Sequence, residues 1–166
     1  MSEHTETILD SNAVERTLRR MAGEIVEANG GTDNLVIVGI QRRGVQLADR
    51  IVALIGASEG ATVPRGAVDI TLYRDDLQTI GPRPVVGATQ LPGGIDGSNI
   101  VIVDDVLFTG RTIRAALDEL ADFGRPARIG LAVLIDRGGR ELPIQPDIVG
   151  RKIDVRTGDC VDVQVR

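Results

Sequence analysis

The stretch IVIVDDVLFTGRTIRAALDEL at residues 100–120 constrains the fold more than any other part of the sequence. It begins with Ile100 to Val103, a run of β-branched apolar side chains typical of a strand buried on both faces of a parallel sheet. Apolar residues then recur at helical spacing, namely Ile113, Ala116, Leu117 and Leu120. The segment between these two patterns is therefore predicted to be a strand-to-helix turn. In open α/β sheets, ligands bind beside such turns, at the carboxyl ends of the strands.

Strands and helices are predicted to alternate along the rest of the chain. Strands are expected at 35–40, 66–73, 100–103 and 128–135, with terminal candidates at 152–156 and 161–165. A first helix is expected to begin at one of residues 10–12 and to end near residue 30, and further helices are expected at 45–56 and 114–120. The Pro- and Gly-rich segment 74–99 is expected to be a long lid-like loop with a short strand at 84–88. This alternation predicts a single three-layer α/β domain, with a mostly parallel central sheet and helices on both faces. We expect residues 1–7 to form a flexible tail and residues 8–166 to form the domain.

The composition excludes several classes of chemistry. One cysteine, Cys160, permits no intrachain disulfide framework and suits a reducing cytoplasm. The single histidine, His4, lies in the polar N-terminal segment, so neither a histidine-based triad nor a His/Cys zinc site is expected. No apolar run reaches the ~18 residues of a membrane span, and the acidic first ten residues do not resemble a targeting signal, so we expect a cytoplasmic protein without a membrane partner. The formal net charge of −5 argues against a generally basic, nucleic-acid-binding surface.

The turn Thr109-Gly110-Arg111-Thr112 has the properties of a phosphate-binding loop. It leads into a helix N-terminus, where unpaired backbone N–H groups and the helix dipole favour an anion, and two threonine hydroxyls can donate to phosphate oxygens. It is not a Walker A loop, and no G-x-G-x-x-G follows a strand. Asp104-Asp105 just before it would repel a simple phosphate, but carboxylates suit a ligand that also has hydroxyls or carries a divalent metal. A phosphorylated sugar offers a phosphate for the threonine turn and hydroxyls for the aspartates. The alternative is an aspartate pair that only caps the turn.

Residues 100–112, IVIVDDVLFTGRT, resemble the phosphoribosyl-pyrophosphate (PRPP) signature of type I phosphoribosyltransferases. Four further segments, VGIQRRGVQLADRI, DITLYRDDL, GRPARIGLAVLIDRGGRELPI and ILDSNAVERTLRRMAGEI, resemble the pyrimidine-operon regulator family, whose members double as uracil phosphoribosyltransferases. The resemblance implies the type I phosphoribosyltransferase fold over nearly the whole chain from Ile8. It also implies a PRPP-binding set consisting of Ile100, Val101, Ile102, Val103, Asp104, Asp105, Val106, Leu107, Phe108, Thr109, Gly110, Arg111 and Thr112.

The resemblance assigns three further loops. The pyrophosphate loop, which often contains a non-proline cis peptide in this superfamily, corresponds to Gln41 with Arg42, Arg43 and Gly44; the alternative is a solvated arginine pair in a turn. The mobile lid corresponds to the segment from Tyr73 that contains Arg74, Asp75 and Asp76, although Arg74 could instead pair with its neighbouring aspartates. The base-binding loop corresponds to Asp136 and Arg137.

The implied reaction is uracil plus PRPP giving uridine monophosphate (UMP) and pyrophosphate. Mg²⁺ is expected to arrive with PRPP, so no residue is assigned as a metal ligand. Asp104 and Asp105 are the expected catalytic residues, because carboxylates can stabilise the cationic ribosyl transition state. A phosphoribosyltransferase for another base is the alternative enzyme. Similar proteins form homodimers and homotetramers, and we expect one of these here.

The resemblance also implies binding of a leader RNA of the pyrimidine operon, stimulated by UMP. The candidate RNA contacts are Arg16, Arg19, Arg20, Arg140, Arg151 and Lys152. Similar regulators usually carry histidine where this chain has Gly23 and Gly139, and a basic residue where it has Gln145. These differences remove donors, so we expect catalysis to be retained and RNA affinity to be weakened. The opposite alternative is an RNA-binding attenuator with little catalysis.

Overall fold

The computed structural model describes residues 5–70, 89–156 and 158–164. A five-stranded sheet forms the centre of these segments, with every strand parallel to its neighbours in the order β2-β1-β3-β4-β5. The elements are α1 (Ser11–Asn29), β1 (Leu35–Ile40), α2 (Arg43–Glu59), β2 (Arg65–Val68), β3 (Asn99–Leu107), α3 (Arg111–Ala121), β4 (Arg128–Asp136) and β5 (Ile148–Lys152).

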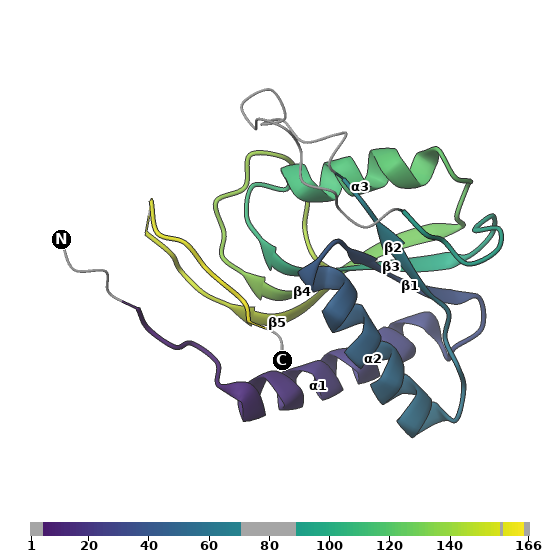
Figure 1. The fold of residues 1–166 in the computed structure, drawn as a ribbon, viewed down its shortest axis with the longest axis horizontal. Helices are drawn as coiled ribbons and strands as arrows, with labels where there is room; N and C mark the ends of the chain where they lie inside the picture. The colour runs from purple at the N-terminus through teal and green to yellow at the C-terminus, as the bar shows by residue number, and fades with distance from the viewer. Residues whose placement is uncertain (1–4, 71–88, 157, 165–166) are drawn as a thin grey trace.

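Helices cover both faces of the sheet, which confirms the predicted three-layer α/β fold. Helices α1 and α2 lie together below the sheet in Figure 1, and α3 lies above it. Each interface has its own apolar core, represented by Leu18, Ile25 and Ile51 on the α1–α2 side and by Ile102, Ile113 and Leu120 on the α3 side. The strands fill both cores because β-branched side chains alternate between the two faces of a buried strand.

Helix α1 begins and ends as its sequence predicts. The Asp10 side chain accepts a hydrogen bond from the Ala13 N–H at 2.8 Å and caps the N-terminus. Gly30, at φ 70°, takes the left-handed conformation that ends many helices, and glycine adopts it without a Cβ clash. Among the residues that the structure describes, no helix is long and apolar enough to cross a membrane.

The bounds of several predicted elements were wrong. Strand β3 continues to Leu107 instead of ending at Val103, because residues 104–107 stay paired with β4, as in Asp104↔Val133 and Leu107↔Asp136. Both aspartates therefore belong to the strand and not to the turn. Helix α3 also begins earlier than predicted, and its Leu117 is 37% exposed instead of facing the core.

Other differences lie at the edges of the sheet. Helix α2 begins two residues before the predicted start at residue 45, and β2 ends at Val68, earlier than the strand predicted at 66–73. Strand β5 precedes the strand predicted at 152–156, because its pairing with β4 begins at Ala132↔Ile148. Residues 161–164 are not in a strand. The predicted lid residues Arg74, Asp75 and Asp76 and the strand at 84–88 lie outside the described residues.

Candidate functional site

The carboxyl ends of β1, β3 and β4 bring the predicted site loops to one edge of the sheet. These three strands are adjacent, with β3 between β1 and β4. The loop after β1 contains the predicted pyrophosphate-binding residues, the turn after β3 is the phosphate-binding turn, and the loop after β4 contains the predicted base-binding residues. A parallel sheet places ligands at this edge, so these three loops form the candidate site.

The phosphate-binding turn leaves the start of α3 open to an anion. Gly110 is the N-cap residue at φ 94° and has no side chain to cap the helix, so the N–H groups of Thr112 and Ile113 remain available. The Thr109 hydroxyl oxygen accepts the Arg111 N–H at 3.2 Å, which leaves the hydroxyl proton free to be donated. A Cβ at residue 110 would lie 3.3 Å from the Ile144 side chain, so glycine suits both the backbone conformation and the space.

Asp104 and Asp105 lie near the end of β3, and Val106, Leu107 and Phe108 separate them from this turn. Asp104 is only 7% exposed, and its Oδ1 accepts the Asp105 N–H at 2.9 Å. Burial, the charge of Asp105 and a side-chain hydrogen bond with Asp105 raise the pKa of Asp104 well above its ordinary value. Asp105 Oδ1 accepts the Val106 N–H at 2.8 Å. The pair therefore combines one buried carboxyl, which holds its proton more tightly than usual, with one more accessible carboxyl.

The pyrophosphate loop lies against β3 because two glycines allow close backbone approach. A Cβ at Gly44 would overlap the Val103 carbonyl oxygen, and a Cβ at Gly39 would lie 2.5 Å from the Gly44 carbonyl oxygen. The Gln41–Arg42 peptide bond is cis, as expected from the resemblance. Glycine therefore brings this loop next to Asp104, the residue that follows Val103.

Arg42 and Arg43 have different surroundings in this loop. Arg42 is exposed, whereas the Arg43 guanidinium lies 3.5 Å from the Asp162 carboxylate of the C-terminal segment. The two predicted pyrophosphate-binding cations thus lie where the loop meets α2, and Arg43 also contacts the C-terminal part of the chain.

Asp136 ends β4 and has an arginine partner. Arg140 Nη2 lies 2.8 Å from Asp136 Oδ1, which also accepts the Gly138 N–H at 3.0 Å. Burial alone would raise the pKa of Asp136, but the hydrogen bonds from Arg140 and Gly138 and the positive charges of Arg140 and Lys152 lower it below its ordinary value. Asp136 is therefore a fixed anion beside the candidate site.

Arg137 forms one wall of a pocket beside the phosphate-binding turn. Its guanidinium lies 3.9 Å from the centre of the Phe108 ring, and its Nη1 donates to the Asp159 carbonyl oxygen at 2.9 Å. The pocket encloses about 450 Å³ and is lined by Val106, Phe108, Arg137, Gly158, Asp159, Cys160 and Val161. This volume is in the range of small-molecule sites.

The sequence did not identify the C-terminal wall of this pocket. Residues 158–161 contain no motif, and part of this segment was predicted to be a strand. The only signal available was apolar: Val161 and Val163 pack against the α1–α2 core and hold the segment in place. A pattern of alternating valines indicates burial but does not show which loop the backbone faces.

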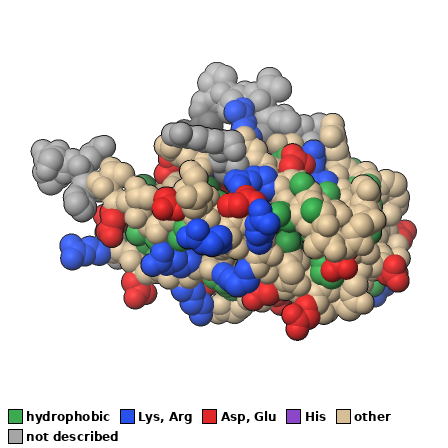
Figure 2. Space-filling model, turned by 90° about the horizontal axis from the view of Figure 1, so that it is seen from below, with side chains coloured by type: hydrophobic (Ala, Val, Ile, Leu, Met, Phe, Trp, Pro, Cys, Tyr) green, Lys and Arg blue, Asp and Glu red, His purple; other side chains and the backbone are tan. Residues whose placement is uncertain are grey.

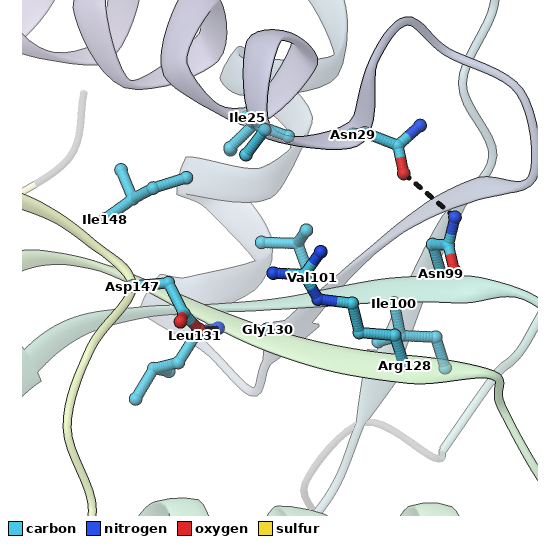
Figure 3. A pocket seen from close by; sticks show the side chains of 11 residues that line it. Ile25, Asn29, Asn99, Ile100, Val101, Arg128, Gly130, Leu131, Asp147 and Ile148 are labelled. Carbon is cyan, nitrogen blue, oxygen red and sulfur yellow. Dashed lines mark hydrogen bonds between the residues drawn. The ribbon is translucent and has the colours of Figure 1, made fainter.

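A second cavity lies at the opposite edge of the sheet. It encloses about 40 Å³ between the end of α1 and the first residues of β3 and β4, where Asn99 Nδ2 donates to Asn29 Oδ1 at 3.0 Å (Figure 3). A space of this size holds little more than ordered water. Of the predicted PRPP-binding residues it touches Ile100 and Val101, at the amino end of β3, and it lies away from Asp104 and the phosphate-binding turn, so it is not the candidate site.

The arginines predicted to contact RNA do not form one surface. Arg19 and Arg20 lie on α1 and form ion pairs with Glu15 and Glu24, and Arg20 also donates to the Val149 and Gly150 carbonyl oxygens of β5. Arg151 lies on the same β5 and donates to the Ile8 carbonyl oxygen. Viewed from the α1 and α2 side, basic side chains gather with acidic ones between them (Figure 2). Arg140 does not belong to this group, because it lies at the ligand edge and contacts Asp136.

Oxygen ligands for a metal are few in the candidate site. No group of three or more His, Cys, Asp or Glu side chains able to hold a metal is found among residues 5–70, 89–156 and 158–164. Asp104 and Asp105 supply at most two carboxylates. This number suits Mg²⁺, which commonly takes one or two protein carboxylates together with substrate phosphates and water.

Comparison with known proteins agrees with this geometry. The model of the phosphoribosyl transferase domain family matches residues 4–164. A protein from Pelotomaculum thermopropionicum named "Bifunctional protein PyrR" is 52% identical over 166 residues, which cover 100% of this chain and 92% of the relative. A protein of the same name from Roseiflexus sp. is 59% identical over 146 residues, covering 88% of this chain and 80% of the relative.

Solved structures with a similar fold include purine enzymes. The hypoxanthine phosphoribosyltransferase of Trypanosoma cruzi superimposes with a TM-score of 0.71 at 18% identity, covering 90% of this chain and 82% of that chain. A hypoxanthine-guanine phosphoribosyltransferase from Bacillus anthracis gives a TM-score of 0.70 at 17% identity, covering 92% and 84%. At these identities the similarity concerns the fold alone.

Proposed function

The chain belongs to the phosphoribosyl transferase domain family and, within it, to the PyrR proteins, and from this premise we propose that it transfers the phosphoribosyl group of PRPP to uracil. The observation that carries the proposal is the meeting of three loops at one sheet edge. The pyrophosphate loop, the aspartate pair with the phosphate-binding turn, and the pocket at Arg137 offer one place each for the pyrophosphate, the ribose phosphate and the base.

Each part of the site has a chemical role in this proposal. The first-turn N–H groups of α3 and the hydroxyls of Thr109 and Thr112 bind the 5-phosphate of PRPP. Asp104 and Asp105 accept the ribose hydroxyls and stabilise positive charge as the bond to pyrophosphate breaks. Arg42 and Arg43 neutralise the departing pyrophosphate. The reaction therefore needs alignment and charge stabilisation but no covalent nucleophile.

Mg²⁺ bound to PRPP fits this donor set. When bound, it neutralises the pyrophosphate charge and thereby makes pyrophosphate a better leaving group. The residues able to reach it are Asp104 and Asp105, and of these Asp105 is the more accessible. The chain's own contribution is to orient the ribose and to limit water around it.

Turnover with a panel of bases tests the proposed substrate. Purified protein is given PRPP and Mg²⁺ with uracil, orotate, hypoxanthine or adenine, and release of pyrophosphate is measured. We expect turnover with uracil alone. Turnover with hypoxanthine and not with uracil would transfer the assignment to the purine enzymes whose fold is similar. Absence of turnover with every base would favour a regulator with little catalysis.

A second function, UMP-dependent binding of pyrimidine-operon leader RNA, is favoured by the arginines on α1 and β5. Arg19, Arg20 and Arg151 lie on adjacent elements and can contact RNA phosphates. The glutamate partners of Arg19 and Arg20 and the net charge of −5 weaken the positive electrostatic potential around these arginines. A gel-shift titration with the leader RNA, with and without UMP, tests this function. We expect weak binding that is reduced further by Arg19→Ala.

Two further parts of the proposal concern the assembly and its compartment. We expect a homodimer or homotetramer that acts in the cytoplasm. Sedimentation at micromolar concentration measures the assembly, and a monomer under these conditions would contradict the expectation.

A further inference from the structure

Arg140 connects the base-binding side of the candidate site to the phosphate-binding side. Each of its three guanidinium nitrogens has a different acceptor: Nε donates to the Ile144 carbonyl oxygen, Nη1 donates to the Phe108 carbonyl oxygen, and Nη2 pairs with Asp136, all at 2.8 Å. Phe108 belongs to the turn after β3, whereas Asp136 ends β4. A single planar group therefore joins the ends of two neighbouring strands.

The loop that carries Arg140 makes a second set of contacts with the same turn. The Thr109 carbonyl oxygen accepts the N–H groups of Glu141 and Leu142 at 2.9 and 3.1 Å. The Glu141 carboxylate lies 2.8 Å from Arg111 Nε. The phosphate-binding turn is thus held by the loop after β4 through backbone and side chain alike.

The Arg140 side chain is much less exposed than those of the candidate RNA-binding arginines on α1. Its side chain is 16% exposed, whereas those of Arg19 and Arg20 are 66% and 47% exposed. Reaching an external phosphate would require it to leave an aspartate and two carbonyl oxygens in a partly buried environment, where unpaired polar groups are costly. The contacts therefore favour a role inside the protein.

We propose that Arg140 is a positioning residue, which fixes Asp136 and the turn at Phe108–Thr112 in one arrangement so that base and PRPP are held in line. This inference rests on the proposed function, because it assigns the two loops to the two substrates. Arginine is required for its shape as well as for its charge: a lysine has one nitrogen and cannot reproduce three coplanar contacts that point in different directions.

Kinetics of Arg140→Gln and Arg140→Lys test the proposal, with Arg128→Gln as the matched control. Arg128 is an exposed arginine at the opposite end of β4. We expect the KM for PRPP to rise ~10-fold or more in Arg140→Gln, because the phosphate-binding turn loses its alignment. Arg140→Lys is expected to recover part of the loss, and Arg128→Gln to keep wild-type kcat and KM.

The pH profile of kcat/KM separates positioning from simple stabilisation. Burial raises the pKa of Asp136, and without Arg140 only the charge of Lys152 and the Gly138 N–H lower it. The pKa of Asp136 should therefore rise, and the acid limb of the profile should move to higher pH. Arg140→Lys retains the charge and should move the limb less. An unchanged KM for PRPP and an unchanged acid limb in both variants would overturn the proposal.

Amide hydrogen exchange distinguishes failure of this inference from failure of the proposed function. In Arg140→Gln, the Glu141 and Leu142 N–H groups that donate to Thr109 should exchange ~10-fold faster than in Arg128→Gln. This measurement needs no turnover and therefore applies even if the wild-type protein uses none of the four bases. If Arg140→Gln does not fold, the same measurement on Arg140→Lys decides, and wild-type exchange in that variant would overturn the proposal.

Discussion

The ends of β3 and β4 each carry a buried aspartate, and the two carboxyls behave oppositely. Asp104 is 7% exposed and Asp136 is 6% exposed. The pKa of Asp104 is raised by burial and by the neighbouring Asp105, whereas the pKa of Asp136 is lowered because Arg140 and Gly138 outweigh the same kind of burial. Similar solvent exposure therefore does not fix the direction of the pKa shift: Asp104 is desolvated beside another carboxyl, whereas the hydrogen bonds and positive charges around Asp136 outweigh its burial.

The difference separates two tasks within one site. A carboxyl that holds its proton more tightly can donate to ribose hydroxyls as well as accept from them, and a nearby cation or positive transition state favours its charged form. A carboxylate fixed by arginine keeps its orientation and charge throughout. The end of β3, where no cation among the described residues lies beside Asp104, is thus suited to catalysis. The end of β4, where Arg140 lies beside Asp136, is suited to holding the loops in place.

The largest expected effect is on catalysis at the β3 end. Asp104→Asn and Asp105→Asn, singly, should each lower kcat/KM with PRPP and uracil by ~10²-fold or more, because an electrostatic stabiliser of the transition state is lost. The fold should remain intact, because the amide replaces each carboxyl at nearly the same size. Initial rates and circular dichroism measure the two effects. Full activity of the double variant would place the reaction elsewhere.

A smaller effect, on stability, is expected at the β4 end. Asp136→Asn leaves Arg140 without its anionic partner and should lower the free energy of unfolding by about 2 kcal/mol. Asp104→Asn is the matched control and should leave stability at pH 7 unchanged or raise it, since no cation pairs with that carboxyl. Urea denaturation measures both variants. Equal losses in the two would contradict the contrast between the strand ends.

The pH dependence of stability should differ in sign at the two aspartates. The folded state keeps the Asp104 proton above the unfolded pKa of about 3.9, so stability falls as pH rises from that value toward the folded pKa. The folded pKa of Asp136 lies below the unfolded value, so its contribution is present above about pH 3.9 and is lost as pH falls through the folded pKa. Urea midpoints should show that Asp104→Asn removes the first dependence and Asp136→Asn the second. Parallel curves for wild type and Asp104→Asn would contradict the first assignment.

The positions of these aspartates could be predicted from the sequence, but the contrast between them could not. The alternation of strands and helices placed Asp104, Asp105 and Asp136 at strand ends, because local composition determines where buried strands occur. The sequence could not show that β3 continues through the aspartates, since that depends on pairing with β4. The sequence could not show the three acceptors around Arg140 either, because an arginine in a loop looks the same whether it faces solvent or protein groups. The C-terminal wall of the pocket was missed because only its backbone packing gives it a place there.

The smallest expected effects concern two glycines that stand where similar regulators usually carry histidine. Gly139 lies at φ 82°, and a Cβ there would lie 2.5 Å from the Phe108 ring, which packs between this loop and Arg137. Gly23 lies within α1, has no positive φ, and has no atom within 4 Å of an added Cβ. Gly139→His should therefore lower the free energy of unfolding by roughly 1 kcal/mol or more, since it imposes a left-handed backbone and displaces the ring.

The same two substitutions sharpen the comparison between the site and the α1 surface. Gly23→His should change stability by only a few tenths of a kcal/mol in the favourable direction, because glycine is the weaker helix former. It adds a hydrogen-bond donor beside Arg19 and Arg20, so a gel-shift titration should show tighter leader-RNA binding with unchanged kcat. Gly139→His should instead alter the KM for uracil, because Phe108 and Arg137 line the pocket. If Gly139→His tightened RNA binding and left KM unchanged, the loop after β4 would belong to the RNA surface and not to the site.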